Sequence, residues 1–356
     1  MTASPHLLIA ISGHGFGHLA QVAPVLAELR RRHPGLRLTL RTGLPREVLE
    51  RRIAPPFDLQ PAADDFGMVQ RSALDVDAAA SAEAYARFHA DWPDRLARTA
   101  RDLSAAGPDL VLADVPYLTL AAAREAGIPA VALCSLNWLD IFHHYCGGRP
   151  GAEQIEAAME AAYAGAESFL RPTPSMAMER LPNTRAIGPV AAPGRSRREE
   201  LAERLGLAPG ERLVLVGMGG IEPAVALSHW PEVPGVRWLA PGLQRPDGVA
   251  TEALGLSFSD LLASADALIT KPGYGSFAEA AACGVPVAYV PRGDWPEEPC
   301  LVEWLTARGG CLPLPREDYE SGRVASTLDA LLACGPVPVL PPTGVAQAAA
   351  ELGRLL

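Results

Sequence analysis

Short apolar runs alternate with helical stretches along this chain, and that alternation restricts its fold more than any other feature. A short run of apolar residues throughout is typical of a strand in a parallel sheet, because helices cover both faces of such a sheet. Helices are predicted over 19–32 and 118–126, and the second should stop at Gly127. The strands predicted around them cover 6–12, 36–42, 109–115 and 130–135. This spacing predicts parallel βαβ units with right-handed crossovers.

The alternation starts again in the second half of the chain. Residues 150–180 look helical, and 186–196 is the best linker candidate because its Gly and Pro residues break both periodicities. Further strands are predicted within 212–220, 236–242, 261–273 and 275–293. We therefore expect an α/β protein with two Rossmann-like, doubly wound parallel-sheet domains, 1–186 and 187–342. A final helix, 343–356, could belong to either domain and could pack back on the first.

The composition indicates a folded, acidic protein. Of the 356 residues, 49% are hydrophobic and 20% charged, which is enough apolar material for packed cores. A formal net charge of −10 argues against nucleic acid as the main partner. No apolar run is long enough to span a bilayer, and the arginine-rich stretch 30–52 is a solvated surface or, as the alternative, a peripheral membrane contact. The six cysteines lack C-x-x-C spacing and suit a reducing cytoplasm.

The loop G-H-G-F-G-H at 13–18 joins the first strand to the first helix and carries two histidines. Its glycines let a ligand approach the backbone at the carboxyl edge of the sheet, where open α/β sheets bind ligands. A helix N-terminus favours the neutral, proton-accepting imidazole, so we interpret His18 and His14 as catalytic. Gly15 and Gly17 are interpreted as substrate-binding. The alternative is a phosphate-binding turn whose histidines only cap the helix.

The segment 270–279 is the strongest ligand-site candidate of the second half. Ser276 and Glu279 have the S-x-x-E spacing of a capping box, with the serine as N-cap. A glycine-flanked helix start also attracts phosphate, and a carboxylate one turn further on can accept both hydroxyls of a ribose. Gly273 and Gly275 clear more space than a cap needs, which favours a ligand contact.

Two shorter segments of the second half are weaker candidates. Gly217, Gly219 and Gly220 follow a predicted strand and could direct backbone N–H groups to a pyrophosphate, although a plain tight turn fits them nearly as well. Glu297 and Glu298 also follow a strand, and adjacent carboxylates there suit sugar hydroxyls. A solvated acidic loop is the alternative for this pair.

The first half has further polar candidates beyond the histidine loop. Asn137 and Asp140 follow a strand and could line a cleft, and Gln70 belongs to a segment of unusually mixed composition at 64–70. We interpret these three residues as substrate-binding. The histidines and cysteine within 143–146 do not indicate a metal site, because adjacent side chains diverge and no further ligand set is evident.

Taken together, these segments resemble those of GT-B glycosyltransferases over nearly the whole chain. Residues 16–43 are similar to the start of the peptidoglycan N-acetylglucosaminyltransferase MurG and of UDP-sugar transferases, and 268–298 to their donor half. A narrower resemblance is to the glycosyltransferase-like N-terminal region of L-arabinokinase-type proteins and their stand-alone bacterial relatives. The motifs that carry it are 13–18, 65–77, 135–145 and 269–292. It implies a GT-B fold with two domains facing across a cleft, but not the sugar-kinase activity of those fusions.

The resemblance also implies roles for individual residues. His18 matches the general base that deprotonates the acceptor, and Glu279 the glutamate that binds the nucleotide ribose. Residues 217–220 match the pyrophosphate loop, and 297–298 fall where relatives contact the donor sugar, although a second glutamate there departs from their pattern. Lys271, the only lysine of the chain, stands where retaining relatives carry a glutamate. Its cation can neutralise a departing nucleoside diphosphate, which favours an inverting displacement.

We therefore predict a cytoplasmic glycosyltransferase that moves a sugar from a nucleotide sugar, with a UDP-sugar as the first choice, to an acceptor that the sequence does not identify. His18, helped by His14, would act as the base, and no metal or other cofactor would be required. Two alternatives remain open. One is an isomerase like the nucleotide-sugar 2-epimerases, and the other is a non-catalytic module that binds nucleotide sugars.

Overall fold

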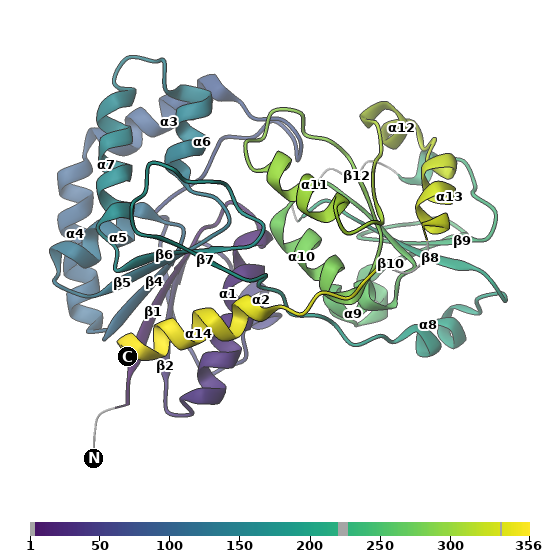
Figure 1. Ribbon diagram of the computed structural model, residues 1–356, viewed down its shortest axis with the longest axis horizontal. Helices are drawn as coiled ribbons and strands as arrows, with labels where there is room; N and C mark the ends of the chain where they lie inside the picture. The colour runs from purple at the N-terminus through teal and green to yellow at the C-terminus, as the bar shows by residue number, and fades with distance from the viewer. Residues whose placement is uncertain (1–3, 220–226, 335–336) are drawn as a thin grey trace. The chain divides into compact units, whose positions relative to one another are not determined.

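The computed structural model describes residues 4–219, 227–334 and 337–356 (Figure 1). The chain folds into two compact units. Unit 1 comprises residues 1–71, 76–190 and 343–356, and unit 2 comprises residues 72–75 and 191–342. The two units are therefore not two consecutive stretches of the sequence. The last helix lies in unit 1, and the short segment 72–75 packs with unit 2.

Unit 1 contains, in the described residues, a seven-stranded parallel sheet in the order β3-β2-β1-β4-β5-β6-β7. The strand order turns back beside β1, as doubly wound sheets require, so β1 and β4 are neighbours. The strands are β1 (His6–Ile11), β2 (Arg37–Thr42), β3 (Asp58–Pro61), β4 (Leu110–Asp114), β5 (Ala130–Leu133), β6 (Ser168–Pro172) and β7 (Thr184–Ile187). The helices are α1 (Phe16–Arg32), α2 (Arg46–Glu50), α3 (Ala78–Ala90), α4 (Trp92–Ala106), α5 (Tyr117–Glu125), α6 (Trp138–Cys146), α7 (Ala152–Ala164) and α14 (Thr343–Leu355).

Helices α1 and α14 lie side by side against one face of this sheet, although they are at opposite ends of the chain (Figure 1). Residues spaced three or four apart along α1, such as Val22, Val25 and Leu29, are apolar and buried in the core beneath the helix. Ala348 and Leu352 of α14 enter the same core. The last helix thus completes the core of unit 1.

Unit 2 contains a second parallel sheet, described with six strands in the order β10-β9-β8-β11-β12-β13. Its strands are β8 (Arg212–Gly217), β9 (Val236–Ala240), β10 (Gly248–Ala250), β11 (Ala267–Thr270), β12 (Val287–Tyr289) and β13 (Cys311–Pro313). Its helices are α8 (Arg198–Leu205), α9 (Phe258–Ser264), α10 (Tyr274–Cys283), α11 (Glu298–Thr306), α12 (Arg316–Ser321) and α13 (Ala325–Ala333), with 3₁₀ turns η1 (Leu227–His229) and η2 (Thr251–Leu254).

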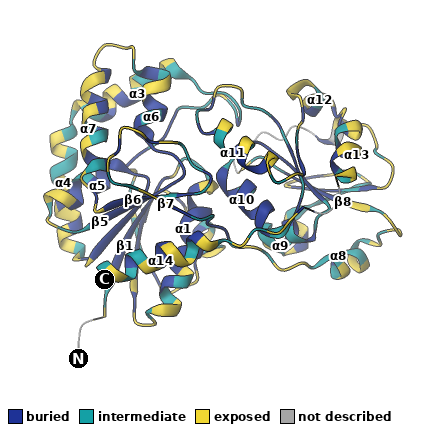
Figure 2. Ribbon diagram, viewed as in Figure 1, coloured by how far each residue is buried: buried dark blue, intermediate teal, exposed yellow. Residues whose placement is uncertain are grey.

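The sheet of unit 2 is apolar on both faces. Leu213 and Leu215 of β8 enter the core under α8 to α11, whereas Val214 and Val216 enter the core under α13. Successive strand residues point to opposite faces, so a continuous apolar run is what a doubly covered sheet needs. Figure 2 shows the central strands of both sheets buried and most of the surrounding helices exposed on their outer sides, whereas α10 is buried.

The predicted fold class, two Rossmann-like parallel α/β units, is confirmed, and one local prediction is partly wrong. The segment 150–180 is helical only as far as Ala164 and then forms the buried strand β6. The helix stops where Gly165 follows it, and β6 then pairs with β5 and β7. Among the described residues, no helix is long and apolar enough to cross a membrane.

Candidate functional site

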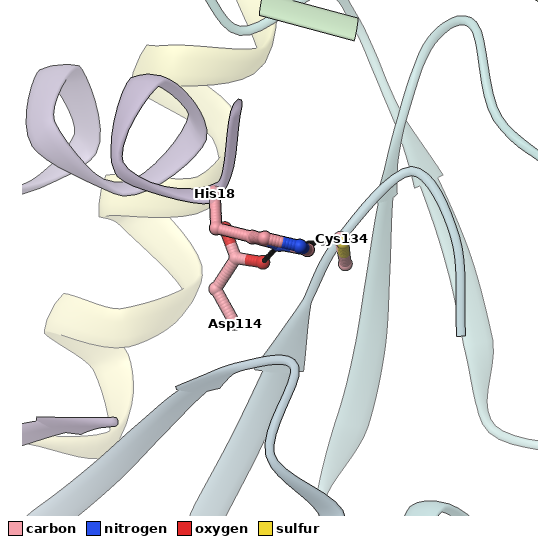
Figure 3. A group of neighbouring side chains, drawn as sticks. All are labelled: His18, Asp114 and Cys134. Atoms are coloured by element: carbon pink, nitrogen blue, oxygen red, sulfur yellow. Dashed lines mark hydrogen bonds and ion pairs between the residues drawn. The ribbon is translucent and has the colours of Figure 1, made fainter. Parts of the chain in front are cut away.

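Three side chains of unit 1 meet at the carboxyl edge of its sheet. His18 is the third residue of α1, Asp114 is the last residue of β4, and Cys134 directly follows β5. The sheet order brings the ends of β4 and β5 beside β1, and Figure 3 shows the three side chains directed toward one another. All three are buried, and the exposed fraction of His18 is only 6%.

His18 and Asp114 form a hydrogen-bonded pair, with 2.8 Å between Nδ1 and Oδ1. Because a carboxylate accepts hydrogen bonds, Nδ1 carries the imidazole proton and Nε2 keeps its lone pair. The buried carboxylate also stabilises the imidazolium that forms when Nε2 takes up a proton. The pair is therefore suited to general-base catalysis through Nε2.

Cys134 approaches the same imidazole from the next strand, with its Sγ 3.7 Å from His18 Nδ1. Gln21 holds the thiol in place, because its Nε2 lies 3.7 Å from Sγ and its Oε1 accepts a hydrogen bond of 2.9 Å from Ser135 N. Gln21 and His18 are three residues apart on α1 and therefore on one side of the helix. Helix α1 thus positions both the imidazole of His18 and the amide of Gln21 that contacts the Cys134 thiol.

His14 lies in the loop before α1 and makes its own contacts. Its Nδ1 is 3.3 Å from Phe66 O, and its Nε2 is 3.0 Å from Gln70 Nε2. A carbonyl accepts and an amide nitrogen donates, so Nε2 is the acceptor and its lone pair is occupied by Gln70. The structure therefore brings His14 and Gln70 together, and the amide of Gln70 orients the His14 ring.

Asp65 is a buried carboxylate behind this loop. It accepts hydrogen bonds from Trp138 Nε1 at 2.7 Å and from Ser12 Oγ at 2.9 Å. Burial raises the pKa of Asp65 to about 6, against the lowering effects of His18 and of these two donors. The indole of Trp138 packs against both histidine rings, with centroid distances of 5.1 Å to His14 and 5.8 Å to His18. Asp65 therefore holds the Trp138 indole, against which both histidine rings pack.

The other residues predicted to bind substrate in unit 1 are placed as follows. Gly15 is the N-cap of α1, and at Gly17 an added Cβ would meet no atom within 4 Å, so the start of α1 has open space beside it. Asn137 is the N-cap of α6, where its Oδ1 accepts from Asp140 N and its Nδ2 donates to Asp140 Oδ2, each at 2.8 Å. The polar groups of this last pair thus serve the helix cap.

In unit 2, Lys271 follows β11 at the carboxyl edge of the sheet. It is nine-tenths buried, and its Nζ donates a hydrogen bond of 3.2 Å to Ala73 O in the segment 72–75. Burial lowers the pKa of Lys271 to about 7, with a further lowering by Arg292 and an opposing effect of Glu297. Gly219 has a left-handed φ of 76°, and a Cβ there would come within 3.2 Å of Lys271 Cε. Lys271 and Gly219, which lies two residues after the end of β8, are thus direct neighbours.

The helix after Lys271 begins earlier than the capping box predicts. Gly273 is the N-cap of α10 and makes no side-chain cap, so Ser276 is the third helical residue and its predicted role as N-cap is wrong. Tyr274 is the first helical residue, and its side chain is buried in the core of unit 2, so the first turn of α10 packs against that core. Gly275 lies in that first turn, and Glu279 lies further along the helix and is buried.

The two adjacent glutamates after β12 are engaged by their own loop. Glu297 is buried and its Oε2 accepts a hydrogen bond of 3.2 Å from Trp295 Nε1. Glu298 Oε2 accepts one of 2.8 Å from Arg292 N, and burial raises the pKa of Glu298. The Arg292 guanidinium in turn lies 4.0 Å from the centre of the Trp295 ring. Of the glycines predicted to cradle a pyrophosphate, Gly217 ends β8 and Gly220 lies outside the described residues.

The residues of the unit 1 site that the sequence patterns miss include Asp114, Asp65 and Cys134. Asp114 carries a usable signal, since it is the one charged residue at the end of the otherwise apolar run L-V-L-A-D. Its nearness to His18 depends on β4 pairing with β1, which no local pattern specifies.

Comparison with known proteins defines the fold class. No family model matches the chain. The calicheamicin glycosyltransferase CalG4 is similar in structure, with a TM-score of 0.66 and 19% identity over 100% of this chain and 99% of that one. So is Phytolacca americana UGT2 complexed with UDP-2-fluoroglucose and pterostilbene, with a TM-score of 0.57 and 15% identity over 99% and 94% of the two chains. Together with the two parallel sheets, this likeness establishes the GT-B fold.

Among curated proteins, the chain is similar to L-arabinokinase of Arabidopsis thaliana. The two are 27% identical over 344 residues, which are 94% of this chain and 33% of that protein. The chain thus spans about a third of the length of this relative. The resemblance inferred from the four sequence motifs is confirmed.

Proposed function

We propose that this chain is a glycosyltransferase that moves a sugar from a nucleotide sugar to an acceptor hydroxyl with inversion at the anomeric carbon. The observation that carries the proposal is the buried pair of His18 and Asp114, 2.8 Å apart at the carboxyl edge of the first sheet. An imidazole whose Nδ1 proton is held by a carboxylate is a general base through Nε2. The GT-B fold supplies the two α/β units that such a reaction needs, one for each substrate.

We assign the donor to unit 2. Lys271 and Gly219 lie together at the sheet edge, and α10 begins beside Lys271 with an N-cap that makes no side-chain hydrogen bond, which leaves the backbone N–H groups of Gly275 and Ser276 for a ligand. A lysine ammonium and a helix N-terminus both attract phosphate. Glu279, in the next turn, is assigned to the ribose. That Phytolacca americana UGT2, which shares the fold, was complexed with UDP-2-fluoroglucose supports a UDP-sugar as the donor.

The remaining predicted residues are assigned by where they lie. Glu297 and Glu298 are assigned to the donor sugar, and Gly217 and Gly273 to the diphosphate. Gly220, which lies outside the described residues, keeps the pyrophosphate role that the sequence predicts for it. In unit 1 Gly15 and Gly17, at the start of α1, are assigned to the acceptor, and the space beside Gly17 is open. There Gln70 orients His14, and Asn137 with Asp140 holds the start of α6.

The proposed reaction is a single displacement. The acceptor oxygen attacks the anomeric carbon while its proton passes to His18 Nε2, and the bond from that carbon to the diphosphate oxygen breaks. Asp114 stabilises the resulting imidazolium through Nδ1. Lys271 and the start of α10 would stabilise the charge that develops on the leaving diphosphate, so the proposed step uses no metal. We also propose a cytoplasmic location, because none of the six cysteines, each of which is described, forms a disulfide.

The test uses donor turnover, because the acceptor is not identified. Wild type and the variants His18→Ala and Asp114→Asn are incubated with UDP- and dTDP-sugars, either in buffer alone or with a mixed acceptor extract. The nucleoside diphosphate that is released when the sugar passes to water or to an acceptor is then measured. We expect a loss of about 10²–10⁴-fold in turnover for His18→Ala. Nucleotide-sugar binding, measured by calorimetry, should be unchanged, since His18 belongs to unit 1.

The exposed histidine His229 of unit 2 gives a matched control, and His229→Ala should keep full turnover. If His18→Ala turns over donor as fast as wild type with binding intact, the base assignment is wrong. The turnover of Asp114→Asn should lie between that of wild type and that of His18→Ala, because an amide can reverse the tautomer of His18 and place the proton on Nε2.

A further inference from the structure

Cys134 is unused in the proposed reaction, although its thiol lies beside the catalytic pair. The Nδ1 of His18, a carboxylate oxygen of Asp114 and the Sγ of Cys134 all lie within 4.8 Å of one another. Among the described residues, this is the group of three histidine, cysteine or acidic side chains close enough to share one ion. Imidazole, thiolate and carboxylate are the three ligand types that zinc takes in proteins.

The spacing of these atoms fits a tetrahedral zinc ion. With Zn–N of about 2.0 Å and Zn–S of about 2.3 Å, a tetrahedral site has a nitrogen-to-sulfur distance of about 3.5 Å. The observed distance from His18 Nδ1 to Cys134 Sγ is 3.7 Å. The 2.8 Å between His18 Nδ1 and Asp114 Oδ1 is a hydrogen-bond distance, and it would open to about 3.3 Å when an ion replaces the shared proton.

The charges and the surroundings of the group also suit a soft divalent cation. A neutral imidazole, a carboxylate and a thiolate carry a total charge of −2, so a bound Zn²⁺ leaves the buried site neutral. Gln21 Nε2 points at Cys134 Sγ from 3.7 Å and would donate to the thiolate, while Ser135 N fixes its other end. A thiolate ligand selects Zn²⁺ over Mg²⁺, which prefers oxygen.

We propose that His18, Asp114 and Cys134 bind one Zn²⁺ ion, and that the ion inhibits the proposed transferase by occupying its base. On binding, Cys134 releases its thiol proton to solvent, the proton of His18 moves from Nδ1 to Nε2, and Nδ1, Oδ1 and Sγ bind the metal. With its proton on Nε2, the imidazole cannot deprotonate an acceptor. The inhibitory effect rests on the proposed function, whereas the binding site rests on the geometry alone.

Binding is tested without an activity assay. The full chain, freed of metal by a chelator, is titrated with Co²⁺ as a spectroscopic substitute for Zn²⁺, and then with Zn²⁺ against a coloured chelator. Wild type should show a thiolate-to-cobalt charge-transfer band that one equivalent of Zn²⁺ removes. Cys134→Ser should lack the band and bind Zn²⁺ at least tenfold more weakly. The affinity of the wild type should rise with pH, because one thiol proton leaves.

Cys146 provides the matched control, since it is also a buried cysteine of unit 1 and its Sγ contacts Ala78 O instead of other ligands. Cys146→Ser should keep the band and the affinity. Zn²⁺ should raise the unfolding temperature of wild type and of Cys146→Ser, but not of a folded Cys134→Ser. Equal Zn²⁺ affinity in wild type and Cys134→Ser would overturn the site. Binding without loss of turnover would instead refute the inhibition while leaving the site in place.

Discussion

The affinity of unit 2 for a nucleotide sugar should fall as the pH rises through the pKa of Lys271. Burial lowers that pKa to about 7, and Arg292 lowers it further, so the folded, ligand-free protein loses the ammonium charge near neutrality. If the diphosphate binds only to the charged lysine, the apparent Kd is multiplied by one plus the ratio of neutral to charged lysine. Between about pH 6 and about pH 8 this factor grows about tenfold, or about 1.4 kcal/mol.

The assay is calorimetry with a UDP-sugar, whose diphosphate is substituted at both ends and does not titrate in this range. At about pH 8, where most of the lysine is neutral, about 0.9 proton should be taken up for each ligand bound. Comparison of two buffers with different ionisation enthalpies measures that uptake. In Lys271→Arg the charge persists at every pH used, so its affinity should be flat. Lys271→Met should bind weakly and without pH dependence.

A wild-type affinity that is flat from about pH 6 to about pH 8, with no proton uptake, would refute the reasoning. Either the lysine would then not contact the diphosphate, or it would not titrate near neutrality. Unfolding separates these two possibilities. The unfolded chain holds the lysine proton up to its ordinary pKa of 10.5 and the folded one only to about 7. The contribution of Lys271 to stability should therefore rise with pH between these values, and Lys271→Met should lose that rise.

Two further predictions concern Gly67 and Asp65, which lie beside His14 and Trp138. Gly67 has a φ of 64°, and a Cβ there would lie 2.3 Å from His14 Nδ1, so Gly67→Ala should destabilise unit 1 by about 1–3 kcal/mol in denaturant unfolding. Gly127→Ala, at a φ of 69° with no atom within 4 Å, has the strain without the clash, and an equal loss there would contradict the packing argument. Burial raises the pKa of Asp65 from 3.8 to about 6, so its contribution to stability is lost as the pH rises from about 4 to about 6. Asp65→Asn should therefore be more stable than wild type at about pH 7, by up to about 3 kcal/mol, and not at about pH 4. Parallel stability profiles for the two proteins would contradict the assignment.

The elements that follow from local pattern could be predicted from the sequence. The strand at 6–12 and the helix after it correspond to β1 and α1, because a buried apolar run and a 3.6-residue period are properties of adjacent residues. The candidate base could be predicted for the same reason, since His18 follows a glycine-rich turn at a strand end. The local S-x-x-E pattern does not give the start of α10, because the helix begins at Tyr274, whose side chain is packed in the core of unit 2.

The partners of the site residues could not be predicted in this way. Asp114 and Cys134 approach His18 only after β4 and β5 have taken their places beside β1, and that order is a property of the whole sheet. Likewise, Lys271 donates to Ala73, which is 198 residues earlier in the chain. Contacts over such separations depend on tertiary packing, which local propensity does not encode.

The chain leaves unit 1 after Val190 and returns to it at Thr343, and the two points are adjacent, since Gly344 N donates to Pro189 O at 2.9 Å. In evolutionary and engineering terms, unit 2 is therefore a cassette inserted into a single loop of unit 1. A related donor-binding unit could be exchanged between these two positions without moving either terminus. The segment 72–75 would need to change with it, because Asp75 accepts a paired hydrogen bond from Arg316 and Ala73 accepts one from Lys271. Those four residues lie between two stretches of unit 1 in the sequence but pack with unit 2, so a new cassette would have to bind them.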